Sequence, residues 1–250
     1  GYPVKIFLPA QLKSAYNSAD RVRIARLYGA EVTPIDINEF VDGADQLQGV
    51  ERAASFVAIR MKQAYDLQQN DPSNWWANQL CNVDNTKAHR EFTGQEILEQ
   101  IDGKIDVWVA SVGTGGTLLG VAQTLKEANP ELRIAGVVPT DDPRIEWVRS
   151  RAIHKALENF GVPKLRFLIE DVLENNVMDK EITVENADAK NMADRLCREE
   201  GLYCGMSSGA NVVAAIEMAK SMDKGSKIVT VIVDRRDRYS AEYPNEHYVV

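Results

Sequence analysis

The chain has few of the residues that build metal sites and disulfide frameworks. It holds only three cysteines and three histidines in 250 residues. The cysteines are Cys81, Cys197 and Cys204; their spacing matches no paired metal-ligand motif, and an odd number is a poor disulfide framework. We therefore expect three reduced, mostly buried thiols, no metal site and no catalytic triad built on the scattered histidines.

Long apolar runs and an excess of positive charge are also absent. The longest apolar runs, residues 107–112 and 228–233, have the length of strands, whereas a membrane-spanning helix needs about 20 apolar residues. The first ten residues show no charged-then-apolar signal pattern. The formal net charge of −8 argues against a nucleic-acid partner, because phosphate binding needs a basic surface. These absences predict a cytoplasmic protein that binds neither membranes nor nucleic acids.

The chain does contain an alternation of short apolar segments and amphipathic helices, with the 44% hydrophobic content of an ordinary folded protein. The expected strands are residues 5–8, 31–35, 105–112, 133–138, 181–184 and 227–233, with a strand end at 75–79. The expected helices are residues 20–28, 44–67, 86–100, 116–128, 145–160, 187–200 and 210–222. Such alternation means parallel strands joined by crossover helices, and hence an α/β fold.

The most informative stretch is residues 107–118, which read VWVASVGTGGTL: a strand, a glycine-rich turn and the start of a helix. Glycines let several N–H groups point at one anion, and the helix N-terminus adds about half a positive charge. The hydroxyls of Thr114 and Thr117 can donate as well. The loop is neither a Walker A loop nor a dinucleotide fingerprint, since no Lys-Ser/Thr follows and Leu118 occupies the third glycine position. It predicts a phosphate site, with a tight turn that binds nothing as the alternative.

The GTGGT run, and the NPELRIAGVVP run that comes after the next helix, closely resemble the phosphate-binding segment of the cysteine synthase and cystathionine β-synthase family. Five further segments resemble family segments in family order. They are GYPVKIFLPA at 1–10, LYGAEV at 27–32, NQLCNVDNTKAH at 78–89, TGQEI at 93–97 and SSGAN at 207–211. The members of this family are fold-type-II pyridoxal-phosphate enzymes.

The resemblance implies two parallel-sheet, three-layer α/β domains of the tryptophan synthase β-like kind, and a homodimer. Turn residues cluster at 70–74, which read NDPSN. We therefore expect residues 1–78 to be the remainder of a smaller, substrate-side domain and residues 79–250 to be the larger domain that holds pyridoxal 5′-phosphate.

The resemblance also implies roles for particular residues. Gln79 matches the glutamine that helps to receive the substrate carboxylate, with a strand-end polar residue as the alternative. Ser207 and Ser208 sit where a helix begins, which favours helix N-caps. His89 matches a family position, and we expect a structural role for it. The residues implied to hold the cofactor phosphate are Gly113, Thr114, Gly115, Gly116 and Thr117.

The family's cofactor-attaching lysine has no counterpart here. It occurs in an early segment resembling N-P-x-x-S-x-K-D-R, and a second early segment, resembling S-G-N-T-G, grips the substrate carboxylate. Neither occurs in these 250 residues, and GYPVKIFLPA resembles the family sequence just after the second of these segments. We therefore expect the catalytic lysine upstream of Gly1, in a part that is missing from the sequence. The alternative is a homologue that has abandoned catalysis.

Two other positions depart from the family pattern. The family places a serine near the pyridine nitrogen in a run resembling D-S-G-E-R-Y, and Arg235 replaces it in DRRDRY at 234–239. An arginine cannot accept a proton, so it would keep the ring neutral unless it points elsewhere. Residues 161–167 read GVPKLRF where the family has a small glycine-rich loop. Lys164 and Arg166 could there receive a phosphorylated substrate, or form a solvated surface.

The function that the resemblance implies is β-replacement on an O-activated L-serine, either O-acetylserine or O-phosphoserine. The upstream lysine would take the α-proton, and sulfide would add at Cβ to give L-cysteine. One alternative is condensation with homocysteine to give cystathionine. Another is a non-catalytic homologue that acts as a binding protein, which the missing lysine favours and the intact GTGGT run opposes.

Overall fold

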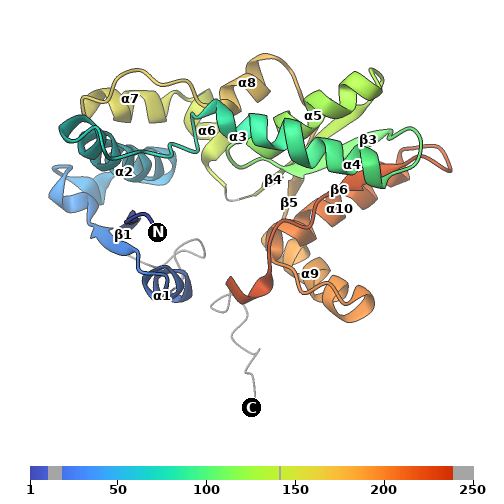
Figure 1. The fold of residues 1–250 in the computed structure, drawn as a ribbon, viewed down its shortest axis with the longest axis horizontal. Coiled ribbons are helices and arrows are strands. Elements are labelled where there is room, and N and C mark those ends of the chain that lie inside the picture. The colour runs from blue at the N-terminus through green and yellow to red at the C-terminus, as the bar shows by residue number, and fades with distance from the viewer. Residues whose placement is uncertain (11–18, 141, 239–250) are drawn as a thin grey trace, which may run out of the picture. The chain divides into compact units, whose positions relative to one another are not determined.

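The computed structural model describes residues 1–10, 19–140 and 142–238 (Figure 1). Its contacts divide the chain into two compact units. Of the described residues, unit 1 contains those within Gly1–Ala77, Pro143–Leu165 and 236–238, and unit 2 contains those within Asn78–Asp142 and Arg166–Arg235. The first boundary lies one residue from the expected one. Residues 143–165, however, belong to the first unit, whereas the sequence-based division kept them in the second.

Unit 1 is built around a two-stranded parallel sheet. Strands β1 (Lys5–Pro9) and β2 (Glu31–Ile35) pair in parallel, with Lys5 opposite Glu31 and Pro9 opposite Ile35. The helices of the unit are α1 (Ala19–Leu27), α2 (Gly49–Asn70), α6 (Arg144–Arg149) and α7 (Ala152–Asn159), with short 3₁₀ turns at Ile37–Glu39 and Ala44–Gln46. Apolar side chains from both parts of the unit share its core, since Phe160 packs against the cluster of Ile35, Ile37, Ala44 and Ile59.

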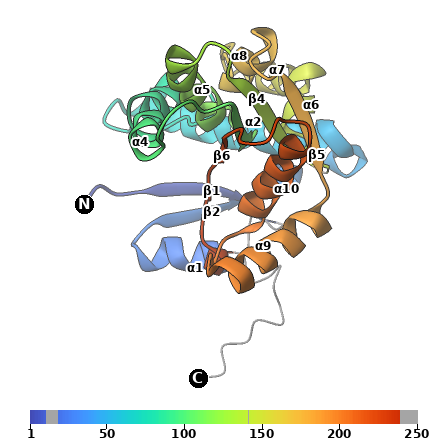
Figure 2. The ribbon, with the colours of Figure 1, turned by 90° about the vertical axis from the view of Figure 1, so that its right-hand side faces the viewer.

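Unit 2 contains a four-stranded parallel sheet in the order β5-β4-β3-β6. The strands are β3 (Val107–Ser111), β4 (Arg133–Pro139), β5 (Lys180–Val184) and β6 (Ile228–Thr230). Helix α10 (Met206–Lys220) packs against one face, and α9 (Asn186–Glu200) packs against α10 (Figure 2). Val107 and Val109 of β3 pack in that core. Trp108 between them points the opposite way, as strand periodicity requires.

The face toward which Trp108 points is covered by α5 (Gly116–Ala128). Three consecutive segments pack against α5: α3 (Val83–Ala88), a π-helical segment η4 (His89–Thr93) and α4 (Gly94–Gln100). The residues at their junctions keep right-handed helical dihedral angles, so the three run as one continuous helix. A further short helix, α8 (Leu168–Glu174), also contacts α5. Helices on both faces of a parallel sheet give the expected three-layer α/β architecture.

Several sequence-based expectations about elements are wrong in detail. The helix expected at 145–160 is two helices, because Arg151 adopts left-handed dihedral angles (φ 60°) between α6 and α7. No strand end occurs at 75–79, and α8 was not foreseen. None of the three described cysteines forms a disulfide, but only Cys204 is buried, while Cys81 and Cys197 are partly exposed. Among the described residues, no helix is both long and apolar enough to cross a membrane.

Candidate functional site

The glycine-rich loop leaves the carboxyl end of β3, an interior strand of the unit 2 sheet, and enters α5. The N–H of Val112 donates to the carbonyl of Val137 at 2.9 Å, so the pairing with the β4 strand continues one residue beyond β3. The indole Nε1 of Trp108 donates to the carbonyl of Leu118 at 3.2 Å, which ties the strand to the first turn of the helix. Carboxyl ends of parallel strands are where α/β sheets place ligands.

Gly115 makes the sharp turn from strand to helix. It caps α5 in a left-handed conformation (φ 93°), and no side chain caps the helix there. A Cβ at this position would lie 3.1 Å from a Val172 methyl and 3.2 Å from the Cα of Ile169, so only glycine fits without displacement. The first turn of α5 carries no acidic residue. Its first N–H groups have no intrahelical acceptor and carry partial positive charge, so this end of the helix favours an anion.

Asn85 connects this loop to the segment that contains Gln79. Its Nδ2 donates to the carbonyl oxygen of Gln79 at 2.8 Å and to Thr114 Oγ1 at 3.1 Å. The N–H of Gly116 also donates to Thr114 Oγ1, at 3.2 Å. A Cβ at Gly116 would lie 2.3 Å from Asn85 Oδ1, so the absence of a side chain at Gly116 is what admits Asn85.

His89 makes the equivalent contact one helical turn later. Its Nε2 lies 3.0 Å from Thr117 Oγ1, and its Nδ1 lies 3.0 Å from Thr93 Oγ1. Burial lowers the pKa of the His89 imidazole below its ordinary value, so the neutral ring is favoured near neutral pH. A Cβ at Gly120 would lie 2.3 Å from the Thr86 carbonyl oxygen and 2.8 Å from His89 Cβ. The glycine at 120 therefore lets the two helices approach closely enough for this contact.

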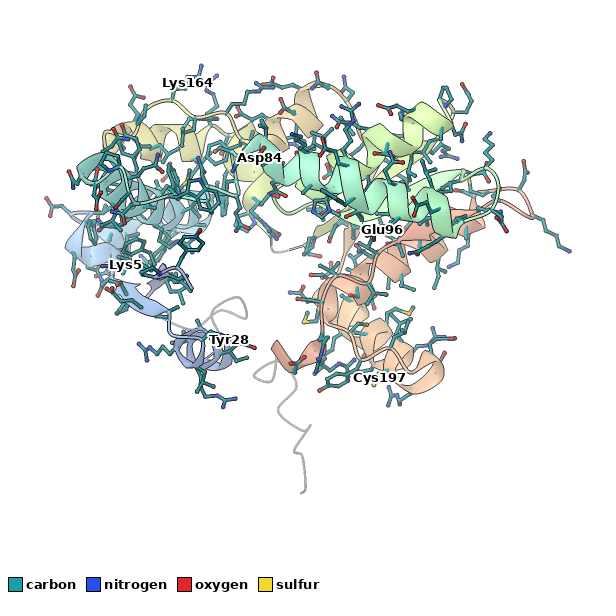
Figure 3. All side chains as sticks on the ribbon, in the orientation of Figure 1. Lys5, Tyr28, Asp84, Glu96, Lys164 and Cys197 are labelled. Atoms are coloured by element: carbon teal, nitrogen blue, oxygen red, sulfur yellow. The ribbon has the colours of Figure 1, made fainter. Side chains whose placement is uncertain are left out.

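The sequence-predicted site residues do not all come together. The five loop residues do, and Asn85 joins the Gln79 backbone to them, while the Gln79 side chain is exposed. Lys164 is exposed in the segment that follows α7 and belongs to unit 1, whereas Arg166 belongs to unit 2 (Figure 3). The role of Gln79 in binding a substrate carboxylate stays a prediction.

Arg166 is not a free cation. Its guanidinium donates to Asp171 at 2.7 Å and lies 2.8 Å from Glu174, and both carboxylates raise its pKa, Glu174 most strongly. A phosphorylated substrate would have to compete with these two carboxylates. That Lys164 and Arg166 receive such a substrate stays a prediction.

The N-terminus of α10, where Ser207 and Ser208 lie, also differs from expectation. The cap of α10 is Gly205, and the two serines lie inside the first turn, so they are not N-caps. Ser208 is fully buried, and its Oγ accepts from the N–H of Val233 at 2.9 Å. Gly205 donates to the carbonyl of Asp234, and Arg235 forms an antiparallel bridge with Cys204. The Arg235 side chain is exposed, and its predicted place near a pyridine nitrogen stays a prediction.

Asn85 and His89 are the residues that the sequence did not single out as part of the site. Both lie in the run NQLCNVDNTKAH, but nothing in that run shows that they contact residues nearly 30 positions away. The signal available was their spacing of four, which puts them on one helix face. Asp84 and Glu96, in contrast, are exposed side chains of α3 and α4 (Figure 3).

The residues of the loop fit the phosphate group of pyridoxal 5′-phosphate. A phosphate ester that has lost both protons is a dianion and only accepts hydrogen bonds, so its site needs donors and disfavours carboxylates. The loop offers backbone N–H groups at a helix N-terminus and two hydroxyls, with no acidic residue in the first helical turn. Because Gly115 and Gly116 have no side chains, the loop does not cover its own backbone at these two positions. The donor set is therefore that of a phosphate site.

Comparison with known proteins agrees with this geometry. A family model described as pyridoxal-phosphate dependent enzyme matches residues 1–234. The chain is 34% identical over 225 residues to cysteine synthase B of Campylobacter jejuni, which covers 89% of this chain and 66% of that protein. It is 30% identical over 251 residues to cystathionine β-synthase of Dictyostelium discoideum, which covers 100% of this chain but 46% of that protein. The chain thus spans less than half the length of that relative.

Solved structures show the same likeness. A hydrogen sulfide-producing enzyme from Fusobacterium nucleatum matches with a TM-score of 0.70 and 28% identity, over 95% of this chain and 72% of that chain. An O-acetylserine-dependent cystathionine β-synthase from Helicobacter pylori matches with a TM-score of 0.71 and 25% identity, over 95% of this chain and 68% of that chain. Both likenesses extend over nearly all of this chain, so the fold is shared along its length.

Proposed function

The chain belongs to the pyridoxal-phosphate-dependent enzyme family, and on that premise we propose that the protein catalyses β-replacement on an O-activated L-serine. The observation that carries the proposal is the loop Gly113–Thr117 at the start of α5, which no side chain caps and whose first helical turn carries no acidic residue. The relatives support the same chemistry, since one is named cysteine synthase B and another an O-acetylserine-dependent cystathionine β-synthase.

In this proposal the described residues bind and orient. The loop and the N-terminus of α5 hold the phosphate, while Trp108 and Asn85 fix the loop from either side. The backbone carbonyl of Gln79 accepts a hydrogen bond from Asn85, which places Gln79 near the loop. Its side chain would receive the substrate carboxylate. When bound, the cofactor withdraws electrons from the substrate Cα, which makes the α-proton acidic and allows the Cβ substituent to leave.

The first candidate for the nucleophile is sulfide, which would give L-cysteine. The second candidate is homocysteine, which would give cystathionine, and it is favoured by the 30% identity to cystathionine β-synthases along the whole chain. For the leaving group, acetate and phosphate are both proposed. The choice among these nucleophiles and leaving groups depends on single contacts in the substrate pocket. Measured turnover with each compound therefore decides it, and the fold does not.

The experiment is a visible absorption spectrum of the intact purified protein, before and after addition of O-acetylserine or O-phosphoserine. Binding of the cofactor predicts a visible band that one of the two amino acids shifts. Sulfide or homocysteine is then added and the product identified by mass spectrometry. A protein that stays colourless after incubation with pyridoxal 5′-phosphate and removal of the unbound cofactor would contradict the proposal and leave a non-catalytic binding role.

A further inference from the structure

Asn85 and His89 lie one helical turn apart and contact the two threonines of the loop. Asn85 reaches Thr114 and His89 reaches Thr117, at 3.1 and 3.0 Å. Residues four apart on a helix share a face, and this face packs against α5. The two contacts therefore form one repeated arrangement, in which each side chain of the first helix meets one hydroxyl of the loop.

We propose that Asn85 and His89 are positioning residues that turn the hydroxyl protons of Thr114 and Thr117 toward the bound phosphate. The inference rests on the proposed function, because it takes pyridoxal 5′-phosphate as the anion. The inference adds to the proposed function two residues from another helix, which orient the hydrogen bonds that the loop hydroxyls donate to the phosphate. Neither residue needs to touch the cofactor for this role.

The Asn85 contact fixes which atom donates. The carbonyl oxygen of Gln79 can only accept, so the amide nitrogen of Asn85 must face it, at 2.8 Å. The second proton of that nitrogen is then directed at Thr114 Oγ1. This oxygen also accepts from the N–H of Gly116, so both of its lone pairs are engaged. Its own proton is left to be donated to a third group, and an anion held by the loop supplies the acceptor.

The His89 contact depends on which ring nitrogen carries the proton. With the proton on Nε2, His89 donates to Thr117 Oγ1, and the threonine proton is available to the anion. With the proton on Nδ1, Thr117 would donate to His89 instead, and its hydroxyl would be lost to the anion. Thr93 Oγ1 lies 3.0 Å from Nδ1 and can donate to that nitrogen, so the Nε2–H form leaves neither ring nitrogen without a partner. Thr93 reaches that nitrogen from the end of the π-helical segment, a feature frequent at functional sites.

Close packing of the helices is what permits both contacts. The glycines at 116 and 120 face Asn85 and His89, and a Cβ at either position would lie 2.3 Å from the neighbouring helix. Interhelical approach of this kind requires small residues. A larger residue at either glycine position would push Asn85 and His89 away from the threonine hydroxyls. The two glycines are therefore needed for both contacts.

The test measures the dissociation constant of pyridoxal 5′-phosphate for the intact protein and four variants. Asn85→Asp keeps the shape of the side chain but removes its donor and adds a negative charge, and we expect affinity to fall by about tenfold or more from both effects. Asn82→Asp is the matched control, because Asn82 caps α3 through an oxygen that aspartate retains. We expect it to bind within about twofold of wild type.

For the histidine, His89→Gln keeps a donor at the position of Nε2, and His89→Leu removes it. We expect the leucine variant to lose about tenfold in affinity and the glutamine variant to recover most of the loss. Equal affinity of Asn85→Asp, His89→Leu and wild type would overturn the inference. Failure of the wild type itself to bind pyridoxal 5′-phosphate would instead overturn the proposed function, so the two failures are distinguishable.

A second readout is made on the wild-type protein and uses a variant only to assign the signal. Nitrogen-15 NMR of the histidine side chains reports which ring nitrogen of His89 is protonated, and the assignment comes from the signal lost in His89→Gln. We expect the Nε2–H form when pyridoxal 5′-phosphate is bound. Protonation on Nδ1 alone in that complex would overturn the His89 part of the inference, whatever the affinities are.

Discussion

Trp108 in β3 donates a hydrogen bond from its indole Nε1 to the carbonyl oxygen of Leu118 in α5, at 3.2 Å. The bond joins the strand before the glycine-rich loop to the helix after it. Trp108 is fully buried, as is Leu118. The residues between them, among them Gly113 and Gly115, are therefore held at both ends by one buried contact.

Replacing Trp108 by Phe keeps an aromatic ring but removes this donor. We expect the free energy of unfolding to fall by about 2–4 kcal/mol, from the lost hydrogen bond and the lost buried volume. Trp147→Phe is the matched control, because Nε1 of Trp147 is buried without an acceptor among the described residues. It should cost clearly less in urea unfolding, and an equal or larger cost would contradict the role assigned to the Trp108 bond.

Gly120 lies where α5 meets the helix that carries His89. Gly120→Ala should destabilise the protein by about 1–3 kcal/mol, because the added Cβ meets a backbone carbonyl that cannot move alone. The intrinsic helix preference for alanine, about 1 kcal/mol, acts in the opposite direction. The pair Gln123→Gly and Gln123→Ala, at an exposed position of the same helix, is the control for that preference. Thermal unfolding checks both, and a stabilised Gly120→Ala would show that the helices do not approach as described.

The pH dependence of stability should carry the signature of His89. Burial lowers its pKa in the folded protein below the value of about 6.5 that it has when unfolded. The unfolded state then binds more protons than the folded state as pH falls through that range, so stability falls with pH there. The α5 residues that contact His89 are Thr117 and Gly120, which do not titrate; nearby Lys87 pairs with Glu91, and Arg90 with Glu127.

His89→Gln has no proton to gain at this position and is the comparison for that prediction. Urea unfolding between about pH 7.5 and 5.5 should show a steeper loss of stability in wild type than in the variant. His154→Gln, at the partly exposed histidine of α7, controls for the substitution itself. Parallel pH curves for wild type and His89→Gln would contradict the assignment of a lowered pKa.

The variant Arg166→Gln tests whether this arginine binds the phosphate of a phosphorylated substrate. Because Asp171 and Glu174 already hold its guanidinium, we expect Arg166→Gln to change kcat/KM for O-acetylserine and O-phosphoserine by the same factor. The surface pairing is weak, so stability should change by less than about 1 kcal/mol. A loss confined to O-phosphoserine would show instead that the arginine leaves its carboxylates to bind the substrate phosphate.

The sequence predicts a phosphate site at the glycine-rich loop, but it does not reveal which residues support the loop. The GTGGT run predicts a tight turn, and the local patterns on either side of it predict a strand and a helix. Together they predict where the loop lies. Asn85 and His89 contact the loop from 29 and 28 residues away, so only the packing of α3 and α5 brings them there. The π-helical turn at His89–Thr93 is equally a product of tertiary packing and has no simple sequence signature.

Other departures have similar causes. Residues 143–165 join the first unit because Phe160 packs in its core, a long-range contact that no local pattern reveals. Ser208 resembles a helix cap in sequence, yet its hydroxyl is used by the N–H of Val233. Cys81 is partly exposed, and burial of its thiol, aided by Glu170, still raises its pKa to about 12, which leaves it a poor nucleophile.

The most direct test of the central claim compares pyridoxal 5′-phosphate with pyridoxal, which lacks the phosphate, as ligands of the intact protein. A phosphate held by Thr114, Thr117 and the α5 N-terminus predicts that the phosphorylated ligand binds at least about a hundredfold more tightly, as expected for several charge-assisted hydrogen bonds. A Thr114→Val, Thr117→Val double variant should reduce that ratio by about tenfold or more. Equal affinities for the two ligands in the wild-type protein would contradict the account.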